Sequence, residues 1–302
     1  MKIMKIQPWL QSFRLKTLPL ALSSTIIGTC LAAAENKFQW QVFGLTALTT
    51  ILLQILSNMA NDYGDFVNGK DTTERIGPKR MVQSGEITPN KMLIGIILIG
   101  ILCSFSGFSL ILLGTKGIDI SNLWIFILLG IAAITAAIKY TVGKNPYGYR
   151  GLGDLFVFVF FGLVGVIGTF FLQTHIFHWD ILLPASAIGF LSTGVLNMNN
   201  MRDYEADKNA NKRTIVVALG LRKATYYHFI LVIGALIMAI AYTLMNYESI
   251  WQWLFILSFP FLFLNLNKVL TYKNALQLYP ELPRLSLASL MFAITFGIGL
   301  LL

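Results

Sequence analysis

Long apolar runs are the feature that most constrains what this chain can fold into. A helix that crosses the hydrocarbon core of a bilayer needs about 20 mostly apolar residues, and the 302-residue chain contains nine such runs. Only 12% of its residues are charged, about half the ~25% of a soluble domain. We therefore predict an all-α, polytopic membrane protein in which nine transmembrane helices surround a central cavity, with residues 1–302 forming one domain. The predicted spans are 17–34, 41–66, 92–114, 121–142, 154–172, 181–201, 223–245, 250–266 and 285–302.

The basic residues predict how these spans are oriented. Of the 23 Lys and Arg residues, 21 fall on one side of the predicted membrane, and only Lys37 and Lys116 fall on the other. Cytoplasmic loops carry such an excess of basic residues, so the N-terminus is predicted in the cytoplasm and the C-terminus outside. The net charge of +9 then needs no nucleic-acid partner, and no nucleic-acid-binding module accompanies it. The basic segments are the N-terminus, 66–91, 139–150, 202–223 and 268–284.

A first acidic cluster closes the second predicted span. Asn58, Asp62 and Asp65 are spaced i, i+4, i+7, so on a helix they project from one face. Asp71 follows a little further along the chain, and Lys79 comes after it in a basic loop. A single pair of this kind is most simply a solvated helix end whose like charges are offset by nearby Lys and Arg.

A second acidic cluster repeats the arrangement four spans later. Asn199, Asp203 and Asp207 are spaced i, i+4, i+8 and are again followed by basic residues. Carboxylate and amide oxygens with open positions are ligands for Mg²⁺, which usually shares its coordination shell with substrate phosphates. Two such faces on one side of the membrane therefore predict a Mg²⁺-bound diphosphate between two acidic helices, with the basic residues neutralising the remaining phosphate charge.

This site would suit an allylic diphosphate that carries a long apolar tail and reaches the protein from the lipid. Cations stabilise the departing diphosphate as its C1–O bond ionises, and a membrane cavity excludes the water that would quench the carbocation. The residues thus predict transfer of a polyprenyl group from a polyprenyl diphosphate to an electron-rich acceptor. The main rival is a secondary transporter, because repeats and intramembrane carboxylates occur there too. A transporter would place its ionisable residues nearer the bilayer midplane than these helix ends.

The two acidic stretches also resemble a known family. Residues 58–71, followed by 77–80, resemble the first aspartate-rich motif of UbiA-type intramembrane prenyltransferases, and residues 199–207 resemble the second. Residues 145–154 look like the members of that family that use 1,4-dihydroxy-2-naphthoate. Asn211 stands where those members usually carry a glycine before Lys-Arg-Thr. The resemblance covers essentially the whole chain and implies a single integral-membrane prenyltransferase domain.

The resemblance implies roles for residues at matching positions. It makes Asp62, Asp65, Asp203 and Asp207 the catalytic carboxylates that hold Mg²⁺ and diphosphate, with Asp71 as a further metal ligand and Asn58 and Asn199 assisting. The residues that would neutralise diphosphate are Lys79, Arg80, Lys212 and Arg213. Tyr140, Arg150 and Asp154, between the fourth and fifth predicted spans, are candidates for the acceptor pocket or its lid. The plainer alternatives are a helix N-cap for Asp154 and a positive-inside anchor for Arg150.

The acceptor and the location also follow from the resemblance. It implies that the carbon of 1,4-dihydroxy-2-naphthoate bearing the carboxylate attacks the allylic cation and that carbon dioxide then leaves, giving a demethylmenaquinone for menaquinone biosynthesis. The nearest alternative acceptors are 4-hydroxybenzoate and homogentisate. The implied cofactor is Mg²⁺, the implied location is the bacterial cytoplasmic (inner) membrane, and no obligate protein partner is indicated.

Overall fold

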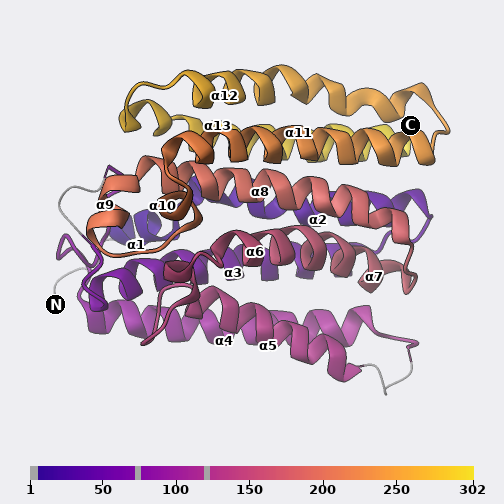
Figure 1. Ribbon diagram of the computed structural model, residues 1–302. Helices are drawn as coiled ribbons and strands as arrows, with labels where there is room; N and C mark the ends of the chain where they lie inside the picture. Colours follow the sequence, from indigo (N-terminus) through magenta and orange to yellow (C-terminus); the bar gives the residue numbers. More distant parts are fainter. Residues whose placement is uncertain (1–5, 72–75, 119–122) are drawn as a thin grey trace.

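The fold is a bundle of long helices that run side by side (Figure 1). The computed structural model describes residues 6–71, 76–118 and 123–302, and every regular element in these residues is helical. The long helices are α2 (Leu18–Ala34), α3 (Trp40–Val67), α4 (Pro89–Gly114), α5 (Leu123–Lys139), α8 (Leu182–Arg202), α11 (Leu221–Met245), α12 (Phe259–Thr271) and α13 (Glu281–Leu301).

The described residues contain nine apolar helical segments, as the sequence predicts. Within the described ranges, eight segments are long and apolar enough to cross a membrane, and the 17-residue α5 is a shorter apolar helix. The prediction of an all-helical, multi-pass membrane protein is therefore confirmed. The first two residues of the predicted span 121–142 lie outside the described residues. Its helix also ends earlier than expected, at Lys139, and the chain then turns through Gly143, whose φ is 108°.

The fifth predicted span is not one uniform α-helix. It consists of α6 (Gly153–Val157), a π-helical segment (Phe158–Ile167) and α7 (Gly168–Thr174). Two glycines of the π-helical segment lie against neighbouring helices. A Cβ on Gly162 would lie 2.7 Å from the Ala185 carbonyl of α8, and one on Gly165 would lie 2.8 Å from Ser24 Cβ of α2. The span therefore packs more closely between α2 and α8 than a row of larger side chains would allow.

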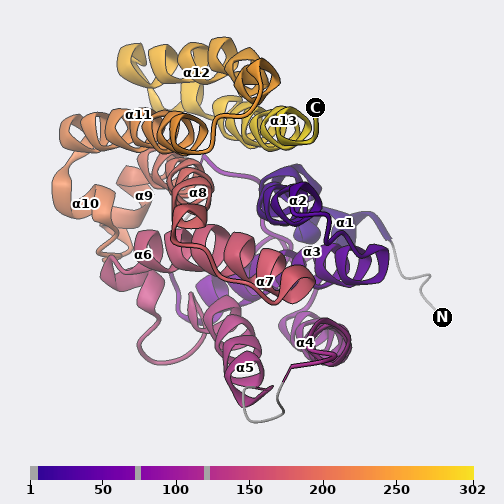
Figure 2. The same ribbon diagram turned by 90° about the vertical axis from the view of Figure 1, so that its right-hand side faces the viewer.

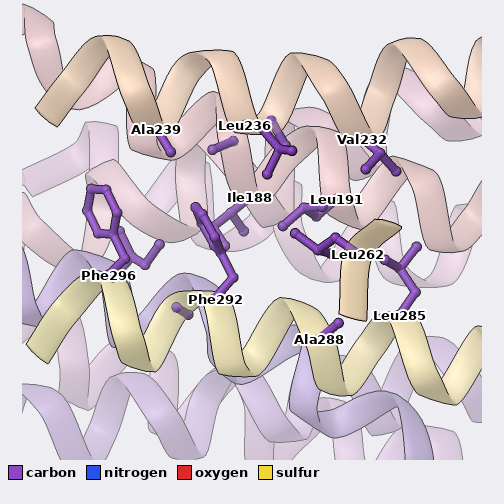
Figure 3. Close-up of a cluster of buried hydrophobic side chains, with 14 of the residues drawn as sticks. Ile188, Leu191, Val232, Leu236, Ala239, Leu262, Leu285, Ala288, Phe292 and Phe296 are labelled. Carbon is purple, nitrogen blue, oxygen red and sulfur yellow. The ribbon is translucent and has the colours of Figure 1, made fainter. Parts of the chain in front are cut away.

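The C-terminal helices form the main apolar core. Figure 3 shows side chains of α8, α11, α12 and α13 meeting, among them Leu191, Leu236, Leu262 and Phe292, all 4% exposed or less. Seen along the helix axes, α12 lies outside α11 and α13, while α13 lies beside α2 and α8 (Figure 2). This arrangement closes the chain into a bundle by packing its last helix against its first long one.

The polarity of the molecule is inverted relative to a water-soluble protein. Phe105 and Ile101 on α4 are 73% and 59% exposed, whereas Asp65 is 2% exposed and Asp203 is 4% exposed. Lipid solvates exposed apolar side chains at no cost, and carboxylates at membrane depth are retained where they face an interior or a cavity. The buried carboxylates of the two acidic motifs are therefore candidates for a functional site.

Three short helices gather at one end of the bundle, within the segments that the sequence analysis assigned to the basic side of the membrane. They are α1 (Ile6–Phe13), α9 (Tyr204–Asn209) and α10 (Ile215–Leu219), and all three lie at the left-hand end of the bundle in Figure 1. Thr214 caps α10 by accepting a hydrogen bond from the Val217 backbone N–H at 3.2 Å. We call this end of the bundle, which also holds both acidic motifs, the site end.

Candidate active site

An elongated cavity connects the site end with the apolar interior. Its volume is about 420 Å³. Asp65, Asp203 and Lys212 line one end of it, and apolar residues such as Leu110 and Leu172 line the other. The lining comes from α2 to α8, from the connections at the site end and from Leu282 of α13. Of the described residues of α11 and α12, none lines it, so the cavity lies among seven of the nine apolar segments and not among all nine.

The first acidic motif closes α3. Asn58, Asn61 and Asp65 line the cavity, spaced i, i+3, i+7 on one face of the helix. Asp62 is turned away from this face. Its two carboxylate oxygens accept hydrogen bonds from the backbone N–H groups of Met81 at 2.8 Å and Val82 at 3.1 Å. Asp62 therefore fixes the loop after α3 rather than facing the cavity.

Asp65 is the carboxylate of this motif that lines the cavity. It accepts hydrogen bonds from the Arg80 guanidinium and the Tyr149 hydroxyl, and Lys212 Nζ lies 3.2 Å from its Oδ2. Arg80 Nε also lies 2.9 Å from Asp71 Oδ1. Burial disfavours the charged form of Arg80, but the nearby carboxylates outweigh burial and raise the pKa of the guanidinium. Asp71, which does not line the cavity, thus holds Arg80 in place against Asp65.

The second acidic motif lies at a helix break that the spacing did not predict. Helix α8 ends at Arg202, and Asp203 separates it from α9. Backbone hydrogen bonds of 3.1 Å from Asp203 N to Asn199 O and of 2.8 Å from Asp207 N to Asp203 O continue the helical spacing across the break. As a result, Asn199, Asp203 and Asp207 still line the same cavity.

Arg202 fixes the side chains of this motif from outside the cavity. Its Nε and one terminal nitrogen donate to Asp203 Oδ1 and Oδ2 at 2.9 and 2.7 Å, and the same terminal nitrogen donates to Asn199 Oδ1 at 2.8 Å. Arg202 does not itself line the cavity. A bidentate grip of this kind fixes the plane of the carboxylate and leaves further lone pairs for a ligand.

Lys212 joins the two motifs. The chain reverses at Asn211, whose φ of 53° is left-handed, a conformation that asparagine tolerates better than most residues and that explains its substitution for glycine. This turn places Lys212 Nζ 3.2 Å from Asp65 and 3.4 Å from Asp207. Burial raises the pKa of Asp207 to about 6, although Lys212 opposes the shift. One cation therefore contacts a carboxylate of each motif.

The donor set fits a magnesium ion that shares a diphosphate. Among the described residues, no three His, Cys, Asp or Glu side chains come close enough to hold a metal by themselves. Mg²⁺, however, is commonly bound through one or two carboxylates together with substrate phosphates. Lys212 Nζ lies between Asp65 and Asp207, so these two carboxylates already share one cation, and substrate phosphates would supply the further ligands that a metal needs.

Several residues predicted for the site do not face the cavity. Lys79 is 61% exposed and lies 3.4 Å from Glu86, and Arg213 and Arg150 are exposed. Asp154 is buried in the first turn of α6, where the Tyr227 hydroxyl hydrogen-bonds to it. The geometry thus brings Arg80 and Lys212 into the cavity and leaves these four outside its lining.

Tyr140 begins an aromatic wall of the cavity. Its ring lies edge-on to Tyr147 at 5.4 Å, Tyr147 stacks on Phe156 at 4.1 Å, and Phe156 stacks on Phe160 at 6.1 Å. All four line the cavity. This wall leads from the charged end towards the apolar part, and aromatic faces are favourable neighbours for a developing cation.

Sequence reasoning missed three residues that build the site. Asn61 shares the helical face of Asn58 and Asp65, and its spacing could have indicated it. Tyr149 lies inside the stretch that carries the family resemblance, but nothing in the sequence shows that its hydroxyl reaches Asp65. Arg202 directly precedes Asp203, and only the helix break explains how it reaches that carboxylate.

Comparison with known proteins identifies the class. Residues 21–300 match the UbiA prenyltransferase family, and the chain belongs to this family. It is 45% identical to the 1,4-dihydroxy-2-naphthoate octaprenyltransferase of Haemophilus influenzae over 99% of this chain and 97% of that one. It is 42% identical to the protein of the same name from Escherichia coli over 100% of this chain and 97% of that one.

Solved structures agree on the fold. A UbiA homologue from Aeropyrum pernix has a TM-score of 0.70 at 16% identity, covering 95% of this chain and 98% of that one. A UbiA homologue from Archaeoglobus fulgidus, bound to GPP and Mg²⁺, has a TM-score of 0.65 at 15% identity, covering 98% of this chain and 100% of that one. At these identities the likeness shows the shared fold.

Proposed function

We propose that this protein transfers a polyprenyl group from a polyprenyl diphosphate to 1,4-dihydroxy-2-naphthoate, with release of diphosphate and carbon dioxide. The observation that carries the proposal is full-length identity of 45% and 42% to two relatives named for this reaction. The cavity supports it, because cationic and acidic residues line one end, whereas uncharged and mainly apolar residues line the rest. A diphosphate ester with a long hydrocarbon tail is likewise charged at one end and apolar along the rest of its length.

We assign the charged end of the cavity to the diphosphate. Asp65, Asp203 and Asp207 would hold Mg²⁺, with Asn199 beside them, and Arg80 and Lys212 would bind phosphate oxygens. Bound Mg²⁺ would act as a Lewis acid that stabilises the leaving diphosphate. Asp62 and Asp71, also expected as ligands, lie where they support the loop and Arg80 instead.

The cavity residues would balance charge and exclude water during the reaction. As the C1–O bond breaks, its electron pair leaves with the diphosphate, and Arg80 and Lys212 balance the added charge. The carboxylate-bearing carbon of the acceptor forms the new bond to C1. Loss of carbon dioxide then returns the electron pair of the carbon–carboxylate bond to the ring, and the product is the reduced form of a demethylmenaquinone. The Tyr140 wall and the lipid-buried bundle keep water from the allylic cation.

The orientation and location are part of the same proposal. The site end would face the cytoplasm of a bacterial inner membrane, with the C-terminus outside. The distribution of Lys and Arg supports this orientation, since 21 of 23 fall on the side that holds both acidic motifs. Both substrates would then be accessible to the cavity, the acceptor from the aqueous side and the donor from the lipid.

One experiment tests the acceptor and the metal together. Purified protein in detergent is given a polyprenyl diphosphate, Mg²⁺ and, separately, 1,4-dihydroxy-2-naphthoate, 4-hydroxybenzoate or homogentisate. We expect prenylation and carbon dioxide release with the naphthoate alone, loss of both with a chelator, and recovery when Mg²⁺ is restored. Prenylation of 4-hydroxybenzoate or homogentisate in its place would overturn the acceptor assignment, and activity that survives chelation would overturn the metal.

A further inference from the structure

The apolar end of the cavity extends far from the carboxylates. Thr49 of α3 lines it, as do Leu110, Phe126 and Leu172. Because an α-helix rises ~1.5 Å per residue, Thr49 lies about 24 Å along α3 from Asp65. The cavity is therefore long enough for a chain of several isoprene units, and its far wall is made of side chains from α4, α5 and α7.

Three glycines on three different helices line this part of the cavity. They are Gly107 of α4, Gly130 of α5 and Gly168 of α7. A Cβ on Gly107 would approach nothing closer than Thr49 Cγ2 at 3.7 Å, and one on Gly130 nothing closer than Ile111 Cδ1 at 3.7 Å. A Cβ on Gly168 would have no neighbour within 4 Å. All three positions thus have room for a side chain that the sequence does not supply.

Close helix packing does not explain these glycines, although it explains others. A Cβ on Gly28 would lie 2.5 Å from the Val166 carbonyl, and one on Gly162 would lie 2.7 Å from the Ala185 carbonyl. At those two positions any side chain would force helices apart. Glycine is a poorer helix former than alanine, and at Gly107, Gly130 and Gly168 its presence relieves no clash. What they preserve is open volume inside the cavity.

We propose that Gly107, Gly130 and Gly168 set the length of the prenyl chain that this protein accepts. This inference rests on the proposed prenyl transfer and assigns the far part of the cavity to the end of the hydrocarbon tail. A larger side chain at any of the three positions would project into the space that the last isoprene units occupy. A short donor would not reach that depth, so it would not be affected.

The test compares long and short donors in leucine variants. Gly107→Leu and Gly168→Leu are assayed with octaprenyl diphosphate and with geranyl diphosphate at saturating acceptor. We expect kcat/KM for the octaprenyl donor to fall by about tenfold or more, as for a hydrophobic pocket that no longer fits its ligand. The value for the geranyl donor should stay within about twofold, which also shows that the variants are folded.

Gly44→Leu is the matched control. Gly44 is an exposed glycine of α3 that does not line the cavity, and a Cβ there would also have no neighbour within 4 Å. This variant should leave the ratio of the two donors unchanged. The inference is overturned if Gly107→Leu and Gly168→Leu keep the ratio of the unaltered protein or lower both donors equally. If the unaltered protein transfers neither donor, the proposed function itself fails, so the two failures are distinguishable.

Discussion

The two acidic motifs look alike in sequence, but their carboxylates are held in different ways. In the first motif, Asp65 meets Arg80 and Lys212, both of which line the cavity with it. In the second, Asp203 is gripped by Arg202, which lies outside the cavity lining. In the first motif, the cations that contact Asp65 also line the cavity, where they can bind a phosphate group. In the second motif, the plane of the Asp203 carboxylate is already fixed by Arg202. We infer that the first motif chiefly balances the charge of the diphosphate and that the second chiefly orients the metal.

Removing the charge of a cavity-facing carboxylate should have the largest effect. We expect Asp65→Asn and Asp203→Asn each to lower kcat/KM by about a hundredfold to a thousandfold, the usual loss when one preorganised electrostatic group is removed. The measurement is transfer to the acceptor at a series of Mg²⁺ concentrations. If the motifs divide their work as described, Asp203→Asn should require more Mg²⁺ than Asp65→Asn does. Equal requirements would erase the distinction between the motifs.

Asp62→Asn should have an intermediate effect, exerted through the loop. The amide keeps one acceptor oxygen but loses the charge that strengthens the bonds to Met81 and Val82 N–H. A hydrogen bond to a charged group contributes ~1.5–3 kcal/mol. Arg80 belongs to the same loop, so we expect KM for the prenyl diphosphate to rise by about tenfold. The Mg²⁺ concentration for half-maximal rate should change little. A loss of metal dependence as severe as in Asp65→Asn would show instead that Asp62 is a ligand.

The smallest effect is expected at Lys79, beside Arg80 in the same loop. Lys79 is 61% exposed and pairs with Glu86 at 3.4 Å, and such surface pairs contribute about 0–1 kcal/mol. Lys79→Met should therefore change KM for the prenyl diphosphate by less than about twofold. Lys212→Met serves as the comparison. It removes the cation shared by the two motifs and should markedly raise KM for the prenyl diphosphate. Similar behaviour of the two variants would contradict the placement of Lys79 outside the site.

The sequence predicted the fold well because the bilayer leaves few alternatives. Backbone groups in hydrocarbon must be hydrogen-bonded, and a continuous apolar run of about 20 residues satisfies them within itself only as a helix. The π-helical segment Phe158–Ile167 was beyond such reasoning, because Gly162 and Gly165 fit it to the surfaces of α2 and α8. Tertiary packing of that kind leaves no mark on hydropathy.

The site was predicted as a region but not residue by residue. Asn58, Asp62 and Asp65 share a helical face by their spacing, but so do Asn58, Asn61 and Asp65, and only packing against the following loop shows which set faces the cavity. The same holds for Lys79 and Arg80, neighbours of equal charge, of which Lys79 is exposed beside Glu86 and Arg80 is buried against Asp65. Direction at a helix end or in a loop is set by contacts distant in sequence. The spacing of residues along the chain does not reveal these contacts.

Because the charges of the cavity are confined to one end, the proposed reaction also prepares its own product release. Both substrates enter as anions, and the groups that would hold them are Arg80, Lys212 and the metal between the acidic motifs. The product has lost the diphosphate and the carboxylate, so it keeps no charged group for that end to retain. The product still interacts with the apolar walls of the cavity, but the surrounding lipid offers an equally apolar environment. Turnover thereby converts a substrate held by ionic contacts into a neutral product that partitions into the bilayer.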